Sequence, residues 1–193
     1  MTLSALIAKY KNNAKRSELG CSDCCYMLQN LTACEKAWCS DPQGTMKRVL
    51  LGRSFWIPTQ KDAHQRRLNS NVLEQAAEAV NCEELIDWMQ ETRGFEDLYN
   101  YLKSLCYFKG LGPVYYYDIA LRIGWCNGIE PEKYVYLHAG PAVAAKSLGL
   151  SGRTVCVQSF YDKCSAFKQM TAKDIENFLC IYRKEIAQIW DVE

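Results

Sequence analysis

Asp118 follows a glycine-rich turn, on a segment whose residue types suit acid–base chemistry. The stretch KGLGPVYYYDIALRIG, residues 109–124, joins that turn to a proline suited to the first turn of a helix and then to the carboxylate. A carboxylate beside a bound substrate can activate water, or stabilise a developing sugar cation during cleavage of an N-glycosidic bond. Asp118 is therefore the first catalytic candidate. The alternative role is an i,i+4 pair with Arg122 that only stabilises the helix.

The two histidines of the chain, His64 and His138, are the next candidates. Imidazole titrates near neutral pH, so either ring suits proton transfer or phosphate contact, and the alternative is a structural imidazole. We assign His138 an orienting or proton-transferring role beside Asp118. Two histidines and one aspartate without helix-spaced ligands do not indicate a metal centre, so neither a metal nor a cofactor is predicted.

The segment KDAHQRRLN carries side chains suited to phosphate oxygens and to the edge of a flipped base. It lies in a stretch punctuated by glycine and proline, and binding residues are frequent on such loops. A solvated run of charge is the alternative. The pattern predicts substrate or DNA contacts by Lys61, His64, Gln65, Arg66 and Arg67.

Three consecutive tyrosines, Tyr115, Tyr116 and Tyr117, precede Asp118. Because they span about 300° of a helix, they cannot all be buried on one face. We expect at least one to stack on a base or to line a pocket, as in enzymes that extrude a base from a duplex. Core packing is the expected role of the other two.

The elements that position these residues are predicted to be helices, because apolar residues recur at helical spacing. The stretch from 40 to 69 is expected to be mostly irregular, and only RTVCVQ resembles a strand. The chain is predicted to be mainly α, with little or no sheet, and to form a single domain over residues 1–193. The expected helices cover 3–16, 22–38, 71–79, 82–91, 95–107, 113–123, a segment from Pro141 and a last one from Thr171.

Composition limits the class of protein. No run approaches the roughly 20 apolar residues that span a bilayer, and the first residues lack the apolar core of a signal peptide, so a cytoplasmic protein without membrane contact is expected. The net charge is +1, but residues 42–70 are basic whereas residues 81–97 are acidic. The oligomeric state is left open.

Eleven cysteines without a secretion signal are expected to be reduced thiols. Four of them have a spacing that is formally able to bind zinc, C-x2-C-x9-C-x4-C. The alternative is cysteine acting as a small buried hydrophobe on a helix, which we favour. The four are Cys21, Cys24, Cys34 and Cys39.

The helices of 95–107 and 113–123, joined by KGLG, predict a helix-hairpin-helix. Gly110 and Gly112 let the backbone turn sharply and approach a ligand, and the N–H groups that open the second helix suit a phosphate. Such a hairpin, with Lys109 beside it, positions DNA without reading its sequence. An ordinary helical corner is the alternative.

Residues 95–145 resemble the helix-hairpin-helix DNA glycosylases of the endonuclease III type, in which a hydrophobic-Asp-Thr-His segment follows the hairpin. Here PEKYVYLHAG places Val135, Tyr136, Leu137 and His138 in that relation. Tyr136 stands at the family's catalytic aspartate and Val114 or Tyr115 at the lysine of its bifunctional members, so the acid–base residue must come from elsewhere. The chain is also similar to small uncharacterised bacterial proteins that share HQRR, YDxAxRIG and VYLHAG.

The resemblance and the candidate residues together predict an enzyme that binds duplex DNA and hydrolyses the N-glycosidic bond of an extruded base. Without the lysine it is expected to be monofunctional. A damaged or bulky modified base is the expected target, for which modified phage DNA is one source. Two alternatives stay open, a non-catalytic DNA-binding module and a protein-interaction domain that uses the acidic segment.

Overall fold

The computed structural model describes residues 1–16, 36–54, 59–91 and 94–190. The described chain is mainly helical, which confirms the predicted fold class at that level. Contacts divide it into two compact units, whereas the sequence predicted one domain. Unit 1 comprises Met1–Cys25 with Pro131–Glu193, and unit 2 comprises Tyr26–Glu130, so the predicted core of 95–145 is divided between them.

Unit 1 packs around a core of aliphatic and aromatic side chains. A two-stranded antiparallel sheet pairs Tyr134 with Cys156 and Tyr136 with Thr154. Phe167, Phe178 and Tyr182 meet at the centre of the core in edge or tilted contacts. The elements are α1 (Leu3–Arg16), β1 (Tyr134–Tyr136), α8 (Ala139–Ser147), β2 (Thr154–Cys156), α9 (Val157–Lys163), the 3-10 helix η2 (Ser165–Gln169), α10 (Ala172–Ile181) and α11 (Arg183–Trp190).

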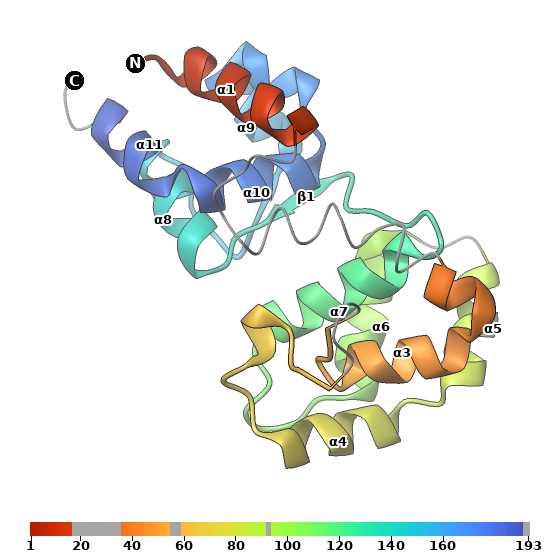
Figure 1. Cartoon of the computed structure of the whole chain (residues 1–193). Coiled ribbons are helices and arrows are strands. Elements are labelled where there is room, and N and C mark those ends of the chain that lie inside the picture. The colour runs from red at the N-terminus through yellow and green to blue at the C-terminus, as the bar shows by residue number, and fades with distance from the viewer. Residues whose placement is uncertain (17–35, 55–58, 92–93, 191–193) are drawn as a thin grey trace. The chain divides into compact units, whose positions relative to one another are not determined.

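Unit 2 is built around one helix, α7 (Pro113–Trp125), on which every residue from Tyr115 to Trp125 is buried. A helix that is apolar on all faces packs inside its domain, with neighbours all round. Here α3 (Pro42–Leu50) and α6 (Phe95–Leu105) pack against it. The other elements are the 3-10 helix η1 (Ala63–Gln65), α4 (Ser70–Ala79) and α5 (Cys82–Gln90) (Figure 1).

The expectation that 40–69 is mostly irregular is wrong for its first third, which forms α3. Pro42 takes the first turn of α3, where its missing N–H costs nothing. Asp41 caps the helix by accepting a hydrogen bond from the backbone N–H of Gly44 at 2.9 Å. The apolar side of α3, which includes Met46 and Leu50, is buried. Proline and glycine therefore mark a helix start here.

The remaining expected helices among the described residues are found within a few residues of their predicted bounds, except that the last one is divided at Tyr182 into α10 and α11. The strand-like segment RTVCVQ forms β2 only over Thr154–Cys156, before α9 begins, and it pairs with β1, a strand that the sequence did not predict. The expected helix of 22–38 lies largely outside the described residues. Among the residues that the structure describes, no helix is long and apolar enough to cross a membrane.

The thiol of Cys106 lies in the core of unit 2, where it donates a hydrogen bond to the carbonyl of Leu102 at 2.9 Å. Burial raises the pKa of the Cys106 thiol from 9.0 to about 12. Since the thiolate is the reactive form, alkylation of Cys106 at pH 8 should be about 10³-fold slower than for an unperturbed thiol. Exposed Cys39 provides the internal comparison.

The measurement is iodoacetamide labelling of the native protein, followed peptide by peptide with mass spectrometry. In denaturant the two cysteines should label at similar rates, because unfolding removes the burial that raises the pKa. Equal rates in the native protein would mean that the interior of unit 2 opens readily around Cys106.

Candidate active site

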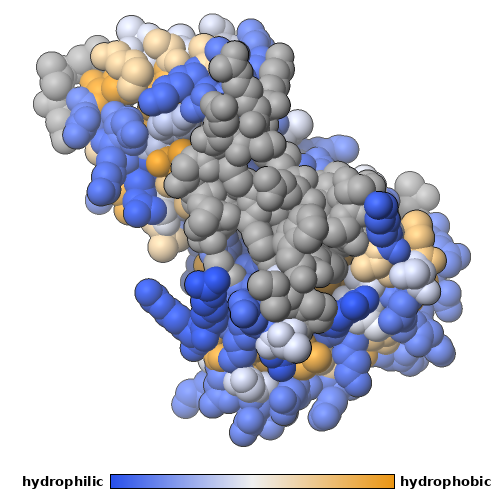
Figure 2. Space-filling model, in the orientation of Figure 1, coloured by the Kyte–Doolittle hydropathy of each residue, from blue (hydrophilic) through white to orange (hydrophobic). Residues whose placement is uncertain are grey.

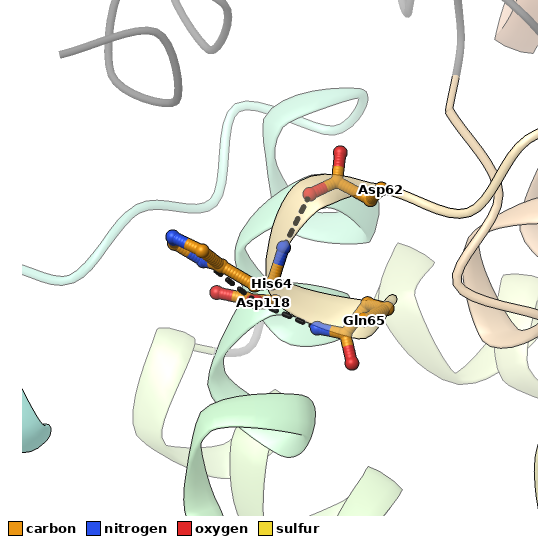
Figure 3. Close-up of polar contacts among 4 residues, drawn as sticks. All are labelled: Asp62, His64, Gln65 and Asp118. Atoms are coloured by element: carbon orange, nitrogen blue, oxygen red, sulfur yellow. Dashed lines mark hydrogen bonds and ion pairs between the residues drawn. The ribbon is translucent and has the colours of Figure 1, made fainter. Parts of the chain in front are cut away.

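The loop that precedes α4 brings two residues of KDAHQRRLN to the central helix of unit 2. Nδ1 of His64 lies 3.1 Å from Oδ2 of Asp118, and Nε2 of Gln65 donates to the same oxygen at 2.6 Å. Asp62 caps η1 through the backbone N–H of His64 (Figure 3). Three candidates from two motifs that lie far apart in the sequence, Asp118 in one and His64 and Gln65 in the other, therefore form one cluster.

The two donors converge on one carboxylate oxygen and leave the other available. Among the described residues, Asp118 has its hydrogen-bond partners on Oδ2 alone. Its side chain keeps about a tenth of its accessible surface, and the His64 side chain keeps 38%. Asp118 is thus nearly buried, fixed through Oδ2, and covered on one side by a partly exposed imidazole.

Gln65 reaches Asp118 because the backbone of Gly52 approaches it closely. A Cβ on Gly52 would lie 2.8 Å from Cβ of Gln65, and Gly52 has a φ of +62°, which favours glycine. The backbone N–H of Asp62 donates to the carbonyl of Gly52 at 2.7 Å, and Arg53 pairs with Lys61 in an antiparallel bridge. The segment before α4 is therefore fastened to the end of α3.

Arg122, one turn after Asp118, holds the same segment at a second point. Its guanidinium donates to the backbone carbonyl of Arg53. Helix α7 is otherwise apolar from Tyr115 to Trp125, and its two charged residues both contact the loop that carries His64. Asp118 itself bonds to His64 and Gln65 of that loop, so its contacts are tertiary and are not confined to its own helix.

The prediction that at least one of the three tyrosines can stack on a base is wrong. Tyr115, Tyr116 and Tyr117 retain 1%, 2% and 3% of their surface, because neighbours cover α7 on all faces. The hydroxyl of Tyr115 donates to the carbonyl of Leu50 at 2.7 Å and that of Tyr116 to the carbonyl of Cys106 at 3.1 Å. Burial accordingly raises the pKa of both phenols. The argument for a bulky modified base, which depended on exposed tyrosines, loses its support.

The other members of KDAHQRRLN face different surroundings. Lys61 is half-buried and its ammonium donates to the carbonyl of Leu68, so it fastens the loop. Arg66 and Arg67 are exposed and remain available to a polyanion. In the view of Figure 2, hydrophilic residues cover most of the visible described surface of unit 2.

Residues 106–112 connect α6 to α7 and carry the other predicted contacts. Lys109 and Gly110 are exposed, and Gly110 has a φ of +105°. Gly112 caps α7 with extended backbone, and a Cβ on either glycine would meet nothing within 4 Å. The space in front of this connection is therefore open on the protein side.

Tyr107, which the sequence analysis did not single out, is 74% exposed two residues before Lys109. The apolar pattern of the sequence could have indicated this exposure. Phe95, Leu98 and Leu102 form the buried stripe of α6, whereas Tyr107 lies beyond the end of that helix. Of the two aromatic rings in this connection, that of Tyr107 is exposed and that of Phe108 is half-buried, so a base could reach Tyr107 more readily.

Comparison with protein-family models, with curated proteins and with solved structures gives no match to this chain.

His138 caps α8 in unit 1, whereas Asp118 belongs to unit 2. The catalytic role of His138 beside Asp118 stays a prediction. His138 is half-buried, and a Cβ on neighbouring Gly140 would lie 3.4 Å from the guanidinium of Arg183.

Three of the four cysteines with zinc-like spacing, Cys21, Cys24 and Cys34, lie outside the described residues. The fourth, Cys39, is exposed. Among the residues that the structure describes, no group of three histidine, cysteine or acidic side chains is placed to hold a metal ion, and every cysteine is a free thiol.

Proposed function

We propose that the chain is a DNA-binding hydrolase that cleaves the N-glycosidic bond of an extruded base. The observation that carries this proposal is the carboxylate of Asp118. Its Oδ2 is held by His64 and Gln65, while Oδ1 has no partner among the described residues. A nearly buried carboxylate with one fixed and one available oxygen can take a proton from water or stabilise positive charge beside it.

The proposed reaction balances without a cofactor. The oxygen of water bonds to C1′ of the sugar, and its proton passes to Oδ1 of Asp118. The C1′–N bond breaks with its electron pair on the base nitrogen, which takes a proton from solvent, directly or through the imidazolium of His64, which solvent then reprotonates. The products are the free base and an abasic sugar, and Asp118 returns its proton to solvent. A lysine nucleophile has no part in these steps, which suits a monofunctional enzyme.

The connection of residues 106–112 supports DNA as the substrate, and we read α6, this connection and α7 as the helix-hairpin-helix. Glycine backbone with open space in front of it suits close approach of a phosphate, and Lys109 and Tyr107 add a charge and an aromatic face. Asp118 follows Gly112 by six positions, which correspond to a rise of about 9 Å along a helix axis. Val114, half-buried, lies one turn before Asp118 on the same side of α7.

The direct test is the formation of abasic sites. The protein is incubated with unmodified, chemically damaged and hypermodified phage DNA, and sites are counted with an aldehyde-reactive probe and alkaline cleavage. Sites on one class of DNA would support the proposal and identify the substrate class. Binding of duplex DNA without abasic sites on any of them would favour a non-catalytic DNA-binding module.

Replacing Lys109 with glutamine is expected to weaken DNA binding uniformly across sequences. One phosphate contact fewer should reduce the slope of log Kd against log salt by about 1. The measurement is fluorescence anisotropy with a labelled duplex over a series of salt concentrations. Lys146→Gln, an exposed lysine on α8, is the matched control and should leave the slope unchanged. Equal slopes for all three proteins would exclude Lys109 as a phosphate ligand.

A further inference from the structure

Gln65 is the one glutamine that the described structure buries, and its amide points at a carboxylate. It retains 1% of its surface, and its Nε2 lies 2.6 Å from Oδ2 of Asp118. Only the NH₂ end of an amide can donate to a carboxylate, so this contact fixes the orientation of the whole group. Because this side chain is buried and its amide faces Asp118, Gln65 is not placed to read a base edge.

The position of Gln65 is fixed from several sides. Its backbone N–H donates to the carbonyl of Asp62 at 2.9 Å, and its carbonyl accepts from the N–H of Leu68 at 3.1 Å. Its Cβ lies where only a glycine at position 52 leaves room. A side chain locked by packing and by backbone bonds holds its partner to a fraction of an ångström, which catalytic geometry requires.

The absence of a charge on Gln65 matters as much as its position. A lysine or arginine at position 65 would neutralise Asp118, whereas an amide donates a hydrogen bond and leaves the site with its negative charge. Both bonds to Asp118 arrive at Oδ2, so they select Oδ1 as the oxygen that faces the substrate.

We infer that Gln65 is a positioning residue, which orients the carboxylate of Asp118 so that Oδ1 meets the reacting water or sugar. This inference rests on the proposed hydrolase function and adds to it the group that sets the geometry of the catalytic carboxylate.

The first test is Gln65→Met, which keeps the length of the side chain and removes the donor. We expect kcat for abasic-site formation to fall about 10- to 100-fold, since a displaced catalytic group loses rate on that scale. The Kd for duplex DNA and the melting temperature should change little. Gln75→Met, on an exposed position of α4, is the matched control and should leave kcat unchanged.

The second test is Gln65→Glu, measured as the pH dependence of kcat. If Gln65 had only a structural role, this substitution would not change that pH dependence. Two carboxyls that share a site hold one proton between them, and the pKa of one is strongly raised. While that proton is bound, the new carboxyl donates to Asp118 as the amide did. When it is lost at higher pH, the two charges repel. The other charged or titratable groups on the elements that carry this pair include His64, which contacts Asp118 directly, Asp62, which caps η1, and Arg122, one turn further along α7.

The kcat of Gln65→Glu should therefore approach that of the wild type at low pH and fall as the pH rises, in a step that the wild type and Gln75→Met lack. If wild-type protein is active but Gln65→Met keeps its kcat, or if Gln65→Glu shows no additional step, the positioning role is wrong and the hydrolase proposal stands. If wild-type protein forms abasic sites on none of the DNA classes, both proposals fall.

Discussion

Asp118→Asn is expected to lower kcat for abasic-site formation by about 10²- to 10⁴-fold, the range over which a positioned acid–base group acts. The two donors on Oδ2 decide how the asparagine would sit. Its carbonyl oxygen must accept from Gln65 and His64, which places its NH₂ group where Oδ1 was. A neutral donor then replaces the oxygen that would receive the proton of water.

The same geometry predicts that Asp118→Asn folds and binds DNA normally, because both hydrogen bonds are kept. The measurements are single-turnover kinetics under saturating enzyme, the Kd for the same duplex and the melting temperature. Asp87→Asn, on the exposed side of α5, is the matched control. Retention of the wild-type rate by Asp118→Asn would remove this residue from the chemistry.

Gly52→Ala is expected to reduce the free energy of unfolding by about 2–5 kcal/mol. A non-glycine residue in the left-handed region costs about 1–2 kcal/mol, and overpacking of a buried contact adds about 1–3 kcal/mol. Here φ is +62° and the new Cβ would lie 2.8 Å from Cβ of Gln65, which is buried and has no room to retreat. The substitution should also lower kcat, since it displaces Gln65.

Gly128→Ala separates the contribution of backbone strain from that of overpacking. Gly128 lies in the same unit, has a φ of +68°, and a Cβ on it would meet nothing within 4 Å. Its loss should be limited to the backbone strain of about 1–2 kcal/mol. Urea unfolding followed by circular dichroism measures both variants. Equal losses would show that the contact between residues 52 and 65 contributes nothing to stability.

Local patterns in the sequence predicted most of the helices. The periodic apolar residues of α4, α5 and α6 define their buried sides, and Pro113 marks the start of α7. Helix α3 was missed because Pro42 and Gly44 were read as breakers, whereas their effect depends on position. Proline at the first turn and a capping Asp41 start a helix, and only the packing of Met46 and Leu50 reveals that they do so here.

The cluster itself could not be predicted from the sequence. Asp118, His64 and Gln65 each have suitable chemistry, but more than fifty residues separate His64 and Gln65 from Asp118, and tertiary packing alone brings them together. The tyrosines were misjudged for a related reason. A helical projection gives the direction of each side chain around the axis and says nothing of how many neighbours surround it.

Because α7 is buried on every face, the positions of unit 2 differ in how well they tolerate substitution. Tyr115 or Ile119 cannot be altered without disturbing the core, so natural variation at such positions should be small. Arg66 and Arg67, on the loop above Asp118, are exposed and can be exchanged at little cost in stability. Under the proposed function, evolution could therefore change the substrate through the loop, while the carboxylate of Asp118 stays where the folded core holds it.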